Sequence, residues 1–188
     1  MSVSDATTVL DVGGTPETWT GLGVRPRVTL LNMPRAGVGP DAGFVCVGAD
    51  GCRLPFADGA FDVVFSNSVI EHVGSEERQR DFAEEVRRVG RSYWVQTPNY
   101  WFPIEAHLLT PGVHFLPKTW QRAVLERGSV WEWLEKPSAD RREFYIEHFL
   151  NDIRLLGAGE LRALFPGARI VRERSIGLTK SLVAVKTV

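Results

Sequence analysis

The sequence is poor in the features that mark disulfide-rich, membrane and nucleic-acid-binding proteins. Its two cysteines, Cys46 and Cys52, are too few and too close together for a disulfide framework, and no group of cysteines and histidines has zinc-motif spacing. We therefore predict no metal site. The formal net charge of −1 gives no global attraction to nucleic acid or an anionic membrane, and we expect neither as a partner. Without a signal peptide or an apolar run of membrane-spanning length, we expect a cytoplasmic protein.

Short apolar runs that end in glycine or polar residues recur along the 188 residues. Such runs are typical of buried parallel strands, and we place them at 7–12, 27–31, 44–47, 61–65 and 92–96. Residues 169–174 and 181–186 are expected to form a closing hairpin, and residues 35–43 a loop. The chain is long enough for one domain and short for two. It therefore predicts a single α/β domain, 1–188, with a doubly wound, mostly parallel seven-stranded sheet and an antiparallel edge strand.

The best-supported helix begins after Ser75, which can act as its N-cap, and ends at Gly90. Phe82, Val86 and Val89 recur in it at helical spacing. Two shorter helices are expected at 17–22 and 158–164.

Residues 99–150 interrupt the alternation of strands and helices. They hold four of the six tryptophans and three of the four histidines, with expected helices at 118–127 and 141–149. We interpret this helical, aromatic insertion as a lid or substrate pocket, since ligand pockets are lined by aromatic residues and a few polar groups. It could also make a dimer contact. The alternative is that its aromatic residues form only a small core of the insertion itself.

Polar residues follow two neighbouring strands between residues 49 and 73. Asp50-Gly51 stands at the end of the third strand, and the fourth strand runs into Ser66-Asn67-Ser68. The carboxyl ends of parallel strands meet at one edge of a sheet, which is where open α/β sheets bind ligands. We therefore expect the functional site at this edge.

Three segments resemble motifs of class I S-adenosylmethionine-dependent methyltransferases of the small-molecule branch. They are VLDVGG at 9–14, ADGCRLPFADGAFDVVFSNSVIEHV at 49–73 and FAEEVRRVGRSYWVQTPN at 82–99. The resemblance implies a Rossmann-like methyltransferase fold, S-adenosyl-L-methionine as the cofactor, and methyl transfer to an oxygen or nitrogen of a small metabolite such as a sugar or natural product.

The resemblance also implies which residues bind the cofactor. Gly13 and Gly14 would let the backbone approach its methionine part, because a Cβ would block it. Asp11 would orient that turn or reach the ammonium group, and Asp50 would accept a hydrogen bond from the adenine amino group. The full implied set is Asp11, Gly13, Gly14, Thr15, Asn32, Met33, Asp50, Gly51, Cys52, Ser66, Asn67, Ser68 and His72. From the residues alone, Asp50 could equally be a turn-capping acid, and His72 a structural histidine.

The sequence departs from the family pattern in three places. Thr15 and Pro16 stand near the second and third glycines of the usual turn, and Asn32 stands where the family carries a ribose-binding acid. Strand one also begins almost at Met1, without the helices that normally precede it and cover the cofactor. A homodimer is one arrangement that would supply this cover. A non-catalytic binding or scaffold protein with the same sheet is the alternative function.

Methyl transfer to a hydroxyl or a protonated amine also needs a base. Our candidate is His107, with Glu105 to orient it or to bind the acceptor, and with His114 in reserve. Tyr100, Trp101 and His148 are the candidate substrate-binding residues.

A nicotinamide-dependent oxidoreductase is the less favoured enzyme class. That class also uses a glycine turn after strand one, but the sequence has no G-x-G-x-x-G run. In addition, Asp50 ends strand three rather than strand two.

Overall fold

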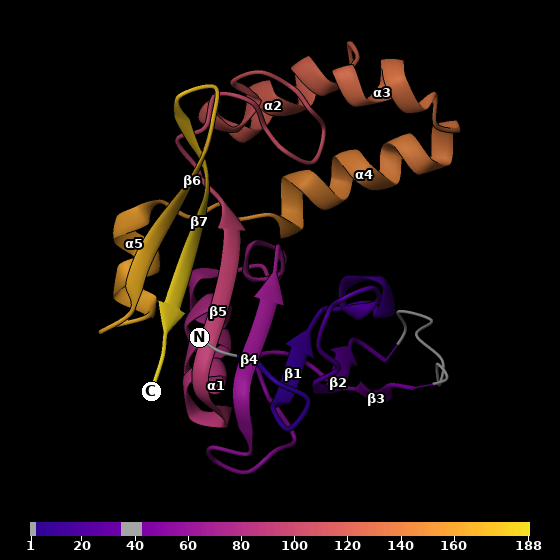
Figure 1. Ribbon diagram of the computed structural model, residues 1–188. Coiled ribbons are helices and arrows are strands. Elements are labelled where there is room, and N and C mark those ends of the chain that lie inside the picture. The colour runs from indigo at the N-terminus through magenta and orange to yellow at the C-terminus, as the bar shows by residue number, and fades with distance from the viewer. Residues whose placement is uncertain (1–2, 35–42) are drawn as a thin grey trace.

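The computed structural model describes residues 3–34 and 43–188 as a mixed sheet with helices packed against it (Figure 1). The strands are β1 (Thr8–Val12), β2 (Arg27–Asn32), β3 (Val45–Gly48), β4 (Phe61–Asn67), β5 (Gly90–Pro98), β6 (Arg169–Ser175) and β7 (Leu178–Lys186). They lie in the order β3-β2-β1-β4-β5-β7-β6, with β1 to β5 parallel and the last two antiparallel. The predicted fold class is confirmed. The loop expected at 35–43 lies, apart from Gly43, outside the described residues.

The helices follow the predicted alternation with two differences. They are α1 (Glu76–Val89), α2 (Lys118–Leu125), α3 (Val130–Glu135), α4 (Ala139–Asp152) and α5 (Ala158–Leu164), with 3-10 helices η1 (Pro16–Trp19), η2 (Ile70–His72) and η3 (Val113–Phe115). The helix predicted at 17–22 is wrong: η1 has only four residues, and the chain turns at Gly21, whose φ is +77°. Helix α3 was not predicted, although Ser129 and Glu132 form a capping box at its start.

The main core lies between the sheet and helices α1 and α5. Phe82 of α1 is fully buried in it, and a Cβ on Gly51, in the loop after β3, would lie only 3.0 Å from its ring. The core therefore fixes the position of the loop after β3 relative to α1.

The insertion stands at the edge of the sheet toward which β4 and β5 point (Figure 1). It has a small core of its own, made by Leu108, Val113, Leu125, Trp131, Ile146, Phe149 and Leu150. Of its four tryptophans only Trp131 belongs to this core, while Trp101, Trp120 and Trp133 are exposed. The insertion thus packs independently above the edge where the polar strand ends gather.

We expect Phe82→Ala to lower the free energy of unfolding by about 3–5 kcal/mol, because it leaves a cavity in the main core. Phe144→Ala is the matched control, since Phe144 is 65% exposed and its loss should change stability by about 0.5 kcal/mol or less. Urea unfolding followed by circular dichroism measures both. Equal effects would contradict this description of the core.

Candidate functional site

A cleft of about 290 Å³ opens at the carboxyl ends of β1, β2 and β3. Six of the residues that the resemblance implies for the cofactor line it: Gly13, Asn32, Met33, Asp50, Gly51 and His72. Val12, Leu31, Val69, Val73 and Phe82 supply its apolar wall, and Arg78 of α1 its positive charge. Residues from three strand ends therefore share one cavity.

The glycine turn after β1 depends on two glycines for different reasons. Gly13 has a φ of +78°, a region that favours glycine, and a Cβ there would collide with the side chain of Val69. A Cβ on Gly14 would collide with the carboxylate of Asp11. Thr15, which follows, is exposed and does not line the cleft.

Asp11 lies buried beneath this turn. Its Oδ2 accepts a hydrogen bond from Trp19 Nε1 at 2.7 Å, whereas its Oδ1 has no partner in the part of the chain that the structure describes. Burial raises the pKa of Asp11 to about 6, and the bond from Trp19 opposes this rise. Asp11 is not among the residues that line the cleft. Trp19 was not among the predicted site residues.

The two polar residues on the far side of the cleft are already tied to the protein. Asn32 Nδ2 donates to the carbonyl of Gly14 at 2.9 Å, so Asn32 offers a ligand hydroxyl only its amide oxygen. Asp50 accepts from the backbone N–H of Cys52 and from Arg78 Nη2, both at 2.9 Å. Burial alone would raise the pKa of Asp50, but these two donors hold it below its usual value. Arg78 carried no local sequence signal for this role.

Four other predicted residues lie elsewhere. The Ser66 hydroxyl is buried and donates to the carbonyl of Val12, which ties β4 to β1. Cys52 Sγ donates to the carbonyl of Arg78, and burial raises the pKa of this thiol to about 11. Asn67 and Ser68 line a second cleft instead.

The second cleft, of about 380 Å³, opens beside the ends of β4, β5 and β7 and reaches the insertion. Ser68 on its wall has a φ of 56° and is held by two bonds to Gln96: its Oγ donates to Oε1 at 2.8 Å, and its N–H to the carbonyl at 3.1 Å. The two clefts are thus separated by the segment from Ser68 to His72.

His114 borders this second cleft and a third, of about 390 Å³, that Tyr100 and Trp101 also line. His114 Nε2 donates to the Tyr100 carbonyl at 2.9 Å, and burial lowers the pKa of this histidine. Its Nδ1 is buried and unpartnered among the described residues. Among the described residues, the structure records no contact between His114 and the other three histidines.

Those three histidines lie in one row. His107 Nε2 lies 3.2 Å from His72 Nε2, and His72 Nδ1 lies 3.2 Å from His148 Nε2. A carboxylate closes each end: Glu105 is 2.5 Å from His107 Nδ1, and Asp152 is 2.7 Å from His148 Nδ1. We call these five residues the histidine row. It joins η2, the loop after β5, and α4.

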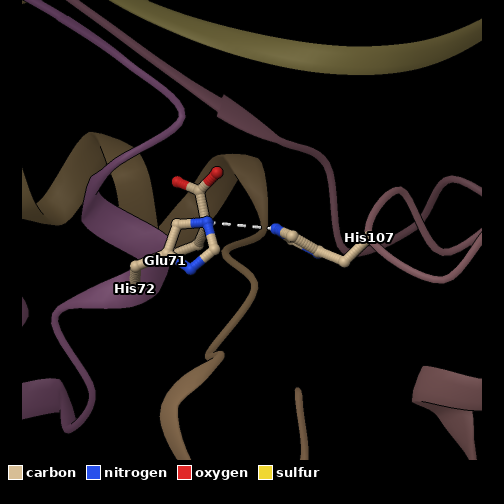
Figure 2. A group of neighbouring side chains, drawn as sticks. All are labelled: Glu71, His72 and His107. Atoms are coloured by element: carbon tan, nitrogen blue, oxygen red, sulfur yellow. Dashed lines mark hydrogen bonds between the residues drawn. The ribbon is translucent and has the colours of Figure 1, made fainter. Parts of the chain in front are cut away.

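Glu71 adds a third carboxylate beside this row, as Figure 2 shows with His72 and His107. Its side chain is fully buried, with Oε2 accepting from Thr97 Oγ1 at 3.1 Å and Oε1 unpartnered in the described chain. Burial raises the pKa of Glu71 to about 7, and it lowers the pKa of His72 to about 4. Neither Glu71 nor Asp152 was predicted. Only their positions in the sequence could have pointed to them: Glu71 directly precedes His72, and Asp152 follows His148 by four residues.

In sequence, a family model described as a methyltransferase domain matches residues 22–92. A curated relative, an uncharacterized methyltransferase of Mycobacterium sp. (strain JLS), is 43% identical over 72 residues, which is 35% of this chain. The aligned part spans only 29% of the length of that relative.

Two solved structures share the fold over nearly the whole chain. A Rhodobacter sphaeroides protein, provisionally assigned as a Zn-dependent alcohol dehydrogenase, has a TM-score of 0.64 and 14% identity, covering 97% of this chain and 84% of its own. A SAM-dependent methyltransferase from Methanosarcina mazei has a TM-score of 0.55 and 12% identity, covering 98% and 94%. At such identities these likenesses show the fold alone. Within the described residues, no helix is long and apolar enough to cross a membrane.

The raised pKa of Asp11 predicts a pH-dependent loss of stability. The folded-state pKa lies above the unfolded value of 3.8, so the contribution of Asp11 to stability is greatest below about pH 4 and is lost as the pH rises through about 6. The shift is worth up to about 3 kcal/mol. Asp11→Asn should therefore gain stability relative to the unmodified protein between pH 4 and pH 7.

Urea unfolding at several pH values measures this difference. Asp140→Asn is the control, because Asp140 is exposed at the start of α4 and its replacement should change little. A stability difference for Asp11→Asn that is the same at pH 4 and pH 7 would show that the carboxylate is not strained by burial.

Proposed function

We propose, from the class I S-adenosylmethionine-dependent methyltransferase domain that the chain carries, that it transfers a methyl group to an oxygen or nitrogen of a small metabolite. One observation supports this proposal above the others. The cleft that six of the expected cofactor residues line contains His72, the central member of the histidine row. A cofactor in this cleft would therefore lie beside a candidate reacting end.

The cleft residues fit the parts of S-adenosylmethionine. Gly13 lines the cleft with its backbone, which suits close approach of the methionine part, and the buried Asp11 would support this turn from beneath. The Asn32 amide oxygen can accept from a ribose hydroxyl, and Asp50, which Arg78 keeps ionised, can accept from the adenine amino group. Bound there, the cofactor would supply an electrophilic methyl group on a positively charged sulfur.

The second cleft supports a small-molecule acceptor. Its volume of about 380 Å³ falls in the range of small-molecule sites, and Asn67, Ser68, Gln96 and Asn99 give it polar groups for orientation. It lies across the Ser68–His72 segment from the cofactor cleft. An acceptor held there and a methyl donor in the first cleft would meet at this segment.

For the reaction itself, the chain mainly has to align the acceptor and exclude water. At the meeting point it presents the imidazole nitrogens of His72 and His107 and the Glu71 carboxylate. Glu105 fixes the His107 ring, because it binds both Nδ1 and the backbone N–H of that residue. These groups support activation of an acceptor hydroxyl or amine at the same place.

Calorimetry with S-adenosylhomocysteine tests the cofactor site. We expect binding by the unmodified protein, and binding weakened about tenfold to a hundredfold in Gly13→Ala, the usual range for overpacking a tight contact. Gly21→Ala is the matched control: Gly21 has nearly the same φ, +77°, but nothing lies near its Cβ position. It should keep the affinity of the unmodified protein.

The same titrations separate the competing functions. Binding of NAD⁺ but not S-adenosylhomocysteine would favour an oxidoreductase. Binding of neither S-adenosylmethionine nor its product at millimolar concentration, by folded protein, would leave the non-catalytic reading and reject the methyltransferase.

A second prediction concerns His107. We expect His107→Ala to reduce methyl transfer by about a hundredfold or more, the usual scale for losing a group that activates the acceptor. Radiolabelled S-adenosylmethionine incubated with fractionated small-molecule extracts gives the assay, and S-adenosylhomocysteine affinity in the same variant is the control. Undiminished transfer would remove His107 from the reaction.

A further inference from the structure

The protons in the histidine row can be placed from its carboxylates. Glu105 is fully buried and accepts three hydrogen bonds, from the backbone N–H groups of His107 and Leu108 and from His107 Nδ1. Both oxygens of Glu105 accept from backbone N–H groups, so the carboxylate acts as the acceptor toward His107 as well. In neutral His107 the hydrogen is then on Nδ1, which faces Glu105. Nε2 of His107 therefore carries a lone pair.

The other end of the row leads to the same result for His72. Asp152 accepts from His148 Nδ1, so Nε2 of neutral His148 also carries a lone pair. His72 Nδ1 faces that lone pair at 3.2 Å and must donate to it. The remaining nitrogen of His72, Nε2, is then left with a lone pair as well.

Two lone pairs thus face each other across 3.2 Å, between His72 Nε2 and His107 Nε2. Glu71 stands beside them: one ligand atom from each of the three residues lies within 4.8 Å of the others. Glu71 is buried and its Oε1 has no partner among the described residues. With the histidines of the row neutral and Glu71 ionised, three electron-pair donors converge, an arrangement that suits a bound cation.

We propose that Glu71, His72 and His107 bind a divalent transition-metal ion, and that Zn²⁺ suits the site best. Two imidazole nitrogens and one carboxylate oxygen are a common ligand set of zinc sites that keep a fourth position for water or substrate. Nitrogens about 2.0–2.1 Å from a tetrahedral ion lie about 3.3–3.4 Å apart, close to the observed separation.

The surroundings of the three ligands also fit an ion. Metal-bound histidines usually donate their other N–H to an outer partner, as His107 does to Glu105 and His72 does to His148. Mg²⁺ and Ca²⁺ prefer all-oxygen sites, so two nitrogen ligands disfavour them. The sequence did not reveal the site, because its ligands are not spaced as in a zinc motif.

The ion site stands without methyl transfer, but its catalytic use rests on the proposed function. His72 also lines the cofactor cleft, so an ion on His72 lies at the border of that cleft. An acceptor hydroxyl at the fourth position would lose its proton more easily, since a bound cation lowers the pKa of the oxygen it binds.

Titration of EDTA-treated, tag-free protein with ZnCl₂ in a calorimeter tests the site. We expect one ion per chain, and visible d–d absorption typical of tetrahedral geometry when CoCl₂ replaces ZnCl₂. Glu71→Gln and His107→Ala should each weaken Zn²⁺ binding by more than about a hundredfold. Glu105→Gln should weaken it by about 10–100-fold, the usual cost of losing an outer partner.

His114→Ala is the matched control, because His114 is the one histidine outside the row and its loss should leave Zn²⁺ affinity unchanged. Circular dichroism confirms folding of each variant. Absence of stoichiometric binding, or affinity unaffected by Glu71→Gln, would overturn the site and leave a proton shared between His72 and His107. The zinc titration needs no methyl donor. Zn²⁺ binding can therefore be absent while S-adenosylhomocysteine still binds, and Zn²⁺ can bind when S-adenosylhomocysteine does not.

Discussion

The backbone of Ser68 determines how the rest of the site is arranged. It leaves β4 with a left-handed φ of 56°, which is costly for a residue with a side chain. Two hydrogen bonds to Gln96 of β5 hold it there. This turn directs the chain into η2, which carries Glu71 and His72 together to the boundary between the two clefts. A relaxed Ser68 would displace both side chains at once.

The histidine row is also a polar connection between the insertion and the segment that follows β4. His72 comes from η2, His107 from the loop after β5, and His148 from α4. The insertion has its own small core, so this row rather than shared apolar packing sets how α4 lies against η2. A backbone bond from Arg154 to the Glu71 carbonyl, at 2.9 Å, strengthens the same junction. Binding of an ion at Glu71, His72 and His107 would therefore fix the insertion over the reactive edge.

The sheet could be predicted because its signals are local. Apolar runs ending in polar residues placed β1 to β5, the expected closing hairpin placed β6 and β7, and Asp50-Gly51 marked the edge where a cleft is found. Helix 17–22 could not be corrected from the sequence, since a four-residue 3-10 turn and a short helix share the same proline signal. The insertion's helix α3 is only six residues long, which is too short for a helical period to be detected.

The site was less predictable because its decisive contacts join distant residues. Arg78 reaches Asp50 across 28 positions, and His107 reaches His72 across 35. Trp19 reaches Asp11 from a turn that the sequence predicts as a helix. Glu71 reads as an ordinary acid near a helix start, and only its complete burial distinguishes it. Contacts between residues so far apart in the sequence depend on strand order and on loop geometry. The sequence implies the strand order, but it does not reveal the geometry of the loops.

Charge balance connects the two halves of the site. A sulfonium donor is positively charged, so groups beside it must not add positive charge, and burial keeps His72 neutral by lowering its pKa to about 4. A divalent ion next to the donor would repel it unless two negative charges accompany the ion. Glu71 would supply one, Glu105 behind His107 would add a second, and an acceptor oxygen that has lost its proton would add a third. Electrostatic repulsion of the donor would therefore be smallest in the complex that can react.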